Sequence, residues 1–188
     1  MNRKQLGVTL ILICLMIIML TGEKLFNNDI KKVALTNNNI GNLNRYNALE
    51  GSISYSLPDT WDVEEKKYPG NYIVYDNNFV SEEMGILGYV QILNTKKSIE
   101  ELVNADKEKL KDKSINKYEC NEDKINGENI TKVFYNEKSN KEKLYLNVIY
   151  YKQLSEGQVL KVLFSSSEDK YKEDYNTIYQ VILDSFEH

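Results

Sequence analysis

The side chains that most often carry out acid–base and nucleophilic chemistry are scarce in this sequence. Histidine occurs once, as His188, the last residue. A frayed chain end cannot hold a base within hydrogen-bonding reach of a serine or cysteine, and one histidine is too few for a His-rich zinc site. A Ser–Lys pair between Ser165–Ser167 and Lys170 is the remaining possibility. A strand end followed by a helix cap explains these serines without catalysis.

Acidic residues offer a second kind of chemistry. Paired carboxylates hydrolyse glycosides, and clustered ones hold hard cations such as Ca²⁺. Lysines such as Lys66 and Lys170 lie beside the acids, so solvent-exposed faces are expected instead. The clusters are Asp62 with Glu64 and Glu65, Glu82–Glu83, and Glu168–Asp169 with Glu173–Asp174. The sequence therefore predicts no catalytic, cofactor-binding or metal-binding residue and a protein that is not an enzyme. A carboxylate-dependent cell-envelope hydrolase is the alternative.

Tyrosine is the most unusual feature of the composition, with 14 residues against one tryptophan. Tyrosine pairs an apolar ring with a polar tip, which suits surfaces that contact carbohydrate or protein. It is also a good strand former, so the same residues fit an ordinary sheet. As a possible binding surface we single out Tyr68, Tyr72 and Tyr75, which crowd one expected hairpin, together with Tyr145 and Tyr151.

Charge and cysteine content exclude two further classes. The formal net charge is −4, and the lysines alternate with acids instead of clustering. Neutralising the phosphates of a nucleic acid requires clustered basic residues, so no nucleic-acid partner is expected. The two cysteines are Cys14 and Cys120. Because Cys14 falls in an apolar segment assigned to the membrane, the two cannot approach closely enough for an intrachain disulfide.

The N-terminal region predicts a membrane anchor. Leu6–Thr21 is uncharged and apolar and follows Arg3 and Lys4; as a helix it would reach roughly 24 Å, against a hydrocarbon core of about 30 Å. We predict a cytoplasmic head at 1–5 and a single transmembrane signal-anchor at 6–22, with the following domain outside the cell membrane. A cleaved signal peptide is the alternative, but cutting after Gly22 would leave a large residue three positions from the cut.

The region after the anchor divides into a polar linker and one folded domain. Residues 23–50 are polar and rich in asparagine, which is typical of a tether, although their first part could extend the anchor helix. Alternating apolar residues, Gly/Pro turns and a Ser98–Glu101 capping box then mark the elements. The expected order is strands near 53–57, 62–67, 72–75 and 89–93, a helix at 98–112, strands near 117–121, 129–135, 143–151 and 159–164, and a final helix capped by Ser166 or Ser167.

This element order predicts an α+β fold in which helices pack on an antiparallel sheet. The opening segment SISYSLPDTWDV, residues 52–63, resembles the start of PsbP-like domains of the PsbP/Mog1 fold, and the mid-chain helix and the closing ILDSF fit the same plan. The resemblance covers about residues 51–188 and is nearest to the bacterial, membrane-associated envelope branch. It implies a non-enzymatic role, but proteins of this fold serve such different processes that no site residue is carried over.

Together these features predict a membrane-anchored, extracytoplasmic binding or accessory module. Its expected contacts are the membrane, through Leu6–Thr21, and a protein or cell-wall partner. A structural tether in a membrane complex is a further alternative to the hydrolase.

Overall fold

A seven-stranded antiparallel sheet forms the centre of the fold in the computed structural model, which describes residues 3–125, 127–139 and 142–187. The strand order is β3-β4-β5-β9-β8-β7-β6, so the last four strands form a continuous meander. The strands are β3 Asp62–Glu65, β4 Ile73–Ser81, β5 Ile86–Asn94, β6 Ser114–Ile125, β7 Glu128–Lys138, β8 Leu144–Ser155 and β9 Gln158–Ser167. The predicted α+β class is confirmed, and the elements expected from residue 53 onward occur in the predicted order.

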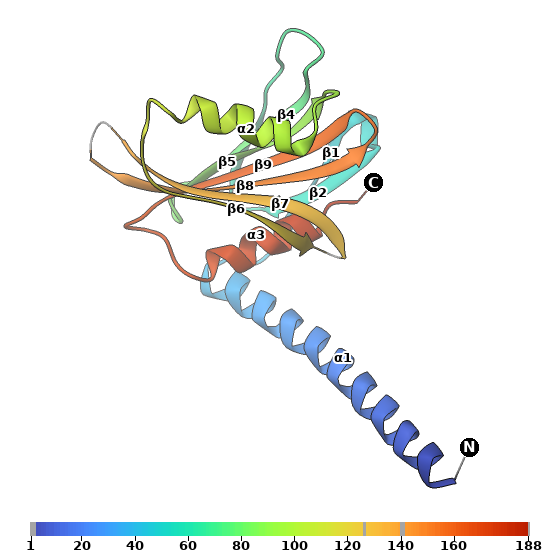
Figure 1. Cartoon of the computed structure of the whole chain (residues 1–188). Helices are drawn as coiled ribbons and strands as arrows, with labels where there is room; N and C mark the ends of the chain where they lie inside the picture. The colour runs from blue at the N-terminus through green and yellow to red at the C-terminus, as the bar shows by residue number, and fades with distance from the viewer. Residues whose placement is uncertain (1–2, 126, 140–141, 188) are drawn as a thin grey trace.

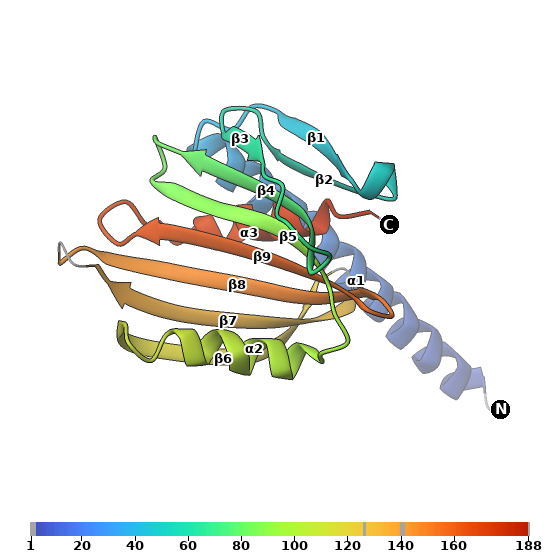
Figure 2. The same ribbon diagram turned by 90° about the horizontal axis from the view of Figure 1, so that it is seen from above.

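Helix α2, Ile99–Lys109, lies on one face of this sheet toward the β6 edge (Figures 1 and 2). It begins with the predicted capping box, in which the Ser98 side chain accepts from the Glu101 backbone and the Glu101 side chain accepts from the Ser98 backbone. Leu102 and Val103 are buried against the apolar side chains of β7, β8 and β9. The β4–β5 half of the same face has no helix over it (Figure 2).

Helix α3, Tyr175–Asp184, packs on the opposite face (Figure 1). Apolar side chains at helical spacing form a stripe along α3, in which Tyr175, Ile178 and Ile182 are buried and the Tyr179 ring stacks on Phe164 at 4.1 Å between centroids. The predicted cap is wrong. Strand β9 continues through Ser167, and the N-cap position belongs to Asp174, so the serines end a strand rather than start a helix.

The prediction of a linker over residues 23–50 is also wrong, whereas the alternative that the first part of this segment extends the N-terminal helix is confirmed. Helix α1 runs from Arg3 to Asn37, and β1, Leu43–Ala48, pairs antiparallel with β2, Ile53–Pro58, through the short helix η1, Leu49–Gly51. Ala34, Ile40 and Ala48 are buried in the core on the α3 face. These few apolar residues are spread among asparagines, so the sequence pattern resembles that of a tether. In the structure their side chains complete the core.

The N-terminal part of α1 projects away from the sheet (Figures 1 and 2). Apolar side chains are more than half exposed at residues 8, 10–13 and 15–18. Among the described residues, no helix combines the length and the apolar character needed to cross a membrane. The predicted transmembrane helix over 6–22 is therefore not supported. Residues 1 and 2 of the predicted head lie outside the described residues.

Candidate functional site

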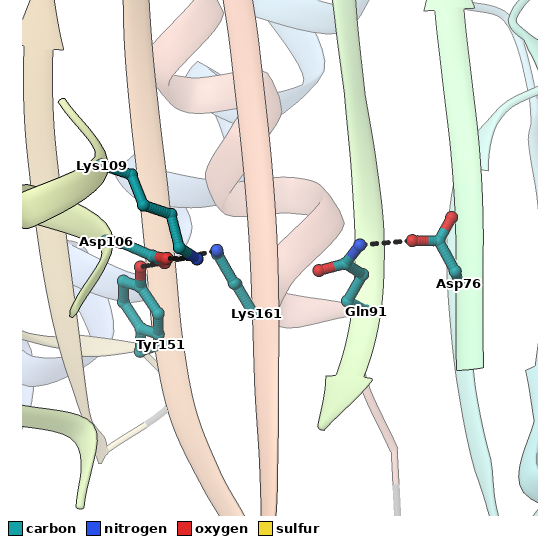
Figure 3. A network of polar contacts seen from close by, with 6 residues as sticks. All are labelled: Asp76, Gln91, Asp106, Lys109, Tyr151 and Lys161. Carbon is teal, nitrogen blue, oxygen red and sulfur yellow. Dashed lines mark hydrogen bonds and ion pairs between the residues drawn. The ribbon is translucent and has the colours of Figure 1, made fainter. Parts of the chain in front are cut away.

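The sheet face beneath α2 carries a cluster of charged and polar side chains that contact one another directly (Figure 3). Asp106 comes from α2, Lys161 from β9 and Tyr151 from β8. Tyr151 donates its hydroxyl hydrogen to Asp106 Oδ2 at 2.6 Å, and Lys161 Nζ donates to the same oxygen. Lys109, one helical turn after Asp106, pairs with Oδ1 at 2.7 Å. Two ammonium groups and one phenol thus converge on a single carboxylate.

This environment fixes the protonation states of the cluster. Burial alone would raise the pKa of Asp106, but the charge of Lys161 and the donated hydrogen bonds outweigh it and lower the pKa to about 2. Burial raises the pKa of Tyr151, and the negative charge of Asp106 raises it further. Burial likewise raises the pKa of Tyr89 on β5. At neutral pH the carboxylate is therefore ionised and the phenols are protonated, an arrangement that supplies neither a general base nor an activated nucleophile.

The polar row continues across the sheet to β4. Strand register places Asp76 opposite Gln91, Gln91 opposite Lys161 and Lys161 opposite Tyr151. Asp76 is buried and accepts hydrogen bonds from the side-chain amides of Gln91 and Asn78, and Figure 3 shows its contact with Gln91. Beyond this row the β4–β5 half of the face exposes Val80 and Leu87, which are paired across the two strands.

The structure separates the five tyrosines that the sequence suggested as one binding surface. Tyr68 and Tyr72 lie in the β3–β4 loop and are 45% and 50% exposed. Tyr75 is buried, and its hydroxyl lies 2.9 Å from that of Tyr55. Tyr151 is buried beneath α2, and Tyr145 is half-buried on β8. The prediction of a shared surface is wrong for Tyr75 and Tyr151, because alternate positions of a strand face opposite sides and both of these rings point into a core.

Tyr72 lines an open cleft of about 1100 Å³ at the end of the sheet where α2 begins. Three connections build the cleft: the β3–β4 loop, the β5–α2 segment and the β8–β9 turn. Two backbone hydrogen bonds hold them together, from the Asn94 nitrogen to the Tyr72 oxygen at 2.7 Å and from the Thr95 nitrogen to the Gly157 oxygen at 2.8 Å. The remaining lining is polar and comprises Asn71, Asn94–Ser98, Glu101, Gln153, Glu156 and Gly157.

The other candidate groups of the sequence do not assemble into a reactive site. Lys170 donates to the Glu82 backbone oxygen instead of pairing with Ser165–Ser167. Within the described parts of the chain, no three His, Cys, Asp or Glu side chains come together as metal ligands. Cys14 and Cys120 are both free and exposed. His188 lies outside the described residues.

Comparisons with known proteins address the fold. No protein-family model matches the sequence, and no curated protein sequence matches it. Among solved structures, cyanobacterial PsbP (CyanoP) from Synechocystis sp. PCC 6803 is similar at a TM-score of 0.50 and 14% identity, over 79% of this chain and 93% of that one. A Mog1 variant is similar at 0.52 and 14% identity, over 78% and 95%. The chain has the PsbP/Mog1 fold. LpqN of Mycobacterium tuberculosis, described as involved in cell envelope biogenesis, matches at 0.47 and 12% identity, over 78% and 91%.

Within the PsbP/Mog1 fold of this chain, the Asp106–Lys161–Tyr151 cluster was missed by sequence reasoning. One signal was present, since Lys161 interrupts an otherwise apolar strand in the segment Val159–Phe164. A lysine at an inward-facing position of a central strand requires a buried partner. That partner comes from α2, and the sequence gives no indication of which acid on the helix supplies it.

Proposed function

We propose that this protein is a non-catalytic binding or accessory module held at the outer side of a bacterial cell membrane by its N-terminal helix. The observation that carries the proposal is the run of exposed apolar side chains at residues 8, 10–13 and 15–18 of α1. Leaving these side chains in water costs free energy in proportion to their apolar area. Contact with lipid removes that cost.

The distribution of these side chains favours lipid over a protein groove. Apolar residues occupy nearly every position from Val8 to Ile18, so they surround the helix instead of forming one stripe. A groove on a protein would cover only one side of such a helix, whereas lipid covers all of it. Attachment requires only that this run enter the apolar layer.

The opposite end of α1 contacts the domain through polar side chains. Lys31 pairs with Asp184 at the end of α3, and the Asn38 side chain donates to Asp174 at its start, at 2.8 Å. The two contacts hold α1 alongside α3 rather than on a flexible tether. The proposal therefore places the domain close to the membrane surface, with α3 on the membrane side of the sheet.

A role in binding rather than catalysis is supported by the chemistry of the Asp106 cluster, in which the pKa of the Asp106 carboxyl is lowered and that of the Tyr151 phenol is raised. The fold is compatible with this role but does not decide it. We assign partner contact to the loop cleft beside Tyr72, because an exposed aromatic ring surrounded by side-chain amides, two carboxylates and two ammonium groups matches the stacking and hydrogen bonding that polyhydroxylated wall polymers require.

Membrane attachment is tested by fractionating cells that express the full chain. The wild type should sediment with membranes, and the double variant Ile11→Asp/Met16→Asp should move to the soluble fraction. Val33→Asp is the matched control, because Val33 is 57% exposed on the same helix but lies beside the domain. A soluble wild type, or release by Val33→Asp to the same extent, contradicts attachment through the apolar run.

Orientation is tested with the exposed thiol of Cys120. In a Cys14→Ser background, a membrane-impermeant maleimide should label intact cells, and Cys120→Ser should abolish the label. Labelling that appears only after cell lysis would place the domain in the cytoplasm.

Partner contact is tested by crosslinking in intact cells followed by mass spectrometry. Tyr72→Ala should reduce recovery of wall-polymer fragments at least fivefold, while Tyr68→Ala, in the same loop but outside the cleft lining, should not. Recovery of a protein insensitive to Tyr72→Ala would support a structural tether instead.

A further inference from the structure

The α3 face of the sheet contains an apolar cavity in addition to the cleft beside Tyr72. Its volume is about 180 Å³, and it lies between the C-terminal end of α3 and strands β7, β8 and β9. Leu183 and Phe186 line it from the helix end, and Ile130, Tyr150 and Leu160 line it from the sheet. All five side chains are buried in the domain core. An apolar cavity slightly larger than 150 Å³ accommodates a benzene-sized ligand and does not hold water favourably.

An ion pair lies at the rim of this cavity. Lys152 and Glu128 both line it, and their side chains are paired with each other. The Lys152 side chain is only 14% exposed, whereas that of Glu128 is 49% exposed. Glu128 is therefore the more solvated partner of the pair, whereas the Lys152 side chain lies mostly out of water beside the cavity walls.

We propose that this cavity binds a short alkyl chain that carries an anionic head group, such as a carboxylate or phosphate. The apolar walls would take up six to eight carbons of the chain, on the order of the cavity's size. The ammonium group of Lys152 would pair with the head group and replace its contact with Glu128. A cationic amphiphile is disfavoured, because its head group would meet the less exposed of the two charges, which has the same sign.

The cavity is also adjacent to the point where α1 reaches α3. Leu183 lines the cavity, and the next residue, Asp184, pairs with Lys31 of α1. If α1 holds the domain at a membrane, the cavity lies near that surface, where free fatty acids and anionic lipids are concentrated. Binding itself does not depend on membrane attachment, so the two proposals can fail separately.

The test is calorimetric titration of the full chain, reconstituted in phosphatidylcholine nanodiscs, with octanoate, octyl phosphate and octanol, after subtraction of titrations into empty nanodiscs. The wild type should bind both anions saturably at one site and bind octanol at least tenfold more weakly. Lys152→Met should remove this preference. A preference for octyl phosphate over octanoate would indicate a lipid phosphate as the natural head group, and the reverse would indicate a fatty acid.

Leu160→Trp should fill the cavity and weaken octanoate binding at least tenfold, and Ile130→Phe is the second filling variant should Leu160→Trp misfold. Leu87→Trp, an equally large change on the exposed face above the sheet, should bind as the wild type does. The proposal is overturned if the wild type shows no saturable binding, if octanol binds as tightly as octanoate, or if a folded filling variant retains wild-type affinity.

Discussion

Replacing Lys161 with methionine removes the principal countercharge of Asp106 while keeping the length of the side chain. The Lys161 and Asp106 side chains are 11% and 20% exposed, so the pair is largely out of water. Removal of one partner of such a pair costs about 3–5 kcal/mol, because the other charge stays buried without compensation. Here Lys109 still pairs with Asp106 at 2.7 Å and the carboxylate keeps some contact with water. We therefore expect a loss of about 2–3 kcal/mol at pH 7.

The pKa of Asp106 gives a separate figure, the net effect of the opposing burial and charge contributions on this carboxyl. Lowering it from 3.8 to about 2 corresponds to about 2.4 kcal/mol, an upper value because water partly screens the group. Since the folded-state pKa lies below the unfolded one, this stability is fully present above about pH 5 and is lost as the pH falls toward 2. The wild type should show that loss on acidification, and Lys161→Met should show a smaller one.

Urea unfolding of the full chain in detergent micelles, followed by the fluorescence of the buried Trp61, measures both effects. Lys152→Met is the matched control, since its partner Glu128 is about half exposed and a loss below about 1 kcal/mol is expected. The double variant Lys161→Met/Asp106→Leu should recover most of the stability, because no uncompensated charge remains. A loss under about 0.5 kcal/mol in Lys161→Met, or an unchanged acid dependence, would refute the assignment of this pair as a buried electrostatic contact.

Three further changes test the packing of the domain by the same unfolding assay. Gly88→Ala should destabilise by about 3 kcal/mol or more, because a Cβ at Gly88 would lie 2.0 Å from the Leu163 backbone oxygen; a loss below about 1 kcal/mol would contradict this close approach. Ser98→Ala should cost about 1 kcal/mol of stability by removing the cap of α2. Ser98→Asp can still cap the helix and should therefore keep most of the wild-type stability. Tyr75→Phe should cost about 1 kcal/mol, since it deletes one hydroxyl of the buried Tyr55–Tyr75 pair; full retention of stability would indicate that this hydrogen bond makes no net contribution.

Local patterns in the sequence were sufficient for most of the sheet and for the start of α2. Alternation at period two in segments such as Ile53–Leu57 and Lys143–Tyr151 predicted strands that the structure contains. The capping box at Ser98 fixed where α2 begins, because both of its hydrogen bonds are made within four residues. The stripe of α3 was equally readable, since helical spacing by itself places those side chains on one side.

Elements whose pairing partners are not indicated by a local pattern were missed or misplaced. Strand β1 carries a weak local pattern and forms because β2 supplies its hydrogen bonds. Strands near 62–67 and 72–75 were expected to form one hairpin, yet β3 pairs with residues 77–80, which leaves a longer loop. Ser166 and Ser167 resemble a helix cap but lie in β9, opposite β5 and β8. In each case the pairing strand decides the outcome, and no pattern within the element itself identifies that strand.

The sequence by itself determined the fold class, the order of the main elements and the scarcity of reactive groups, because these follow from composition and from contacts between residues close together in the chain. Tertiary structure alone decided which polar side chains meet. Asp106 and Lys161 are 55 residues apart, and Lys152 meets Glu128 only because β8 and β7 are neighbours. The cavity beside Leu160 and the separation of the five tyrosines depend in the same way on strand register and on which face each helix covers, because a shift of one residue in register moves every side chain of a strand to the other face.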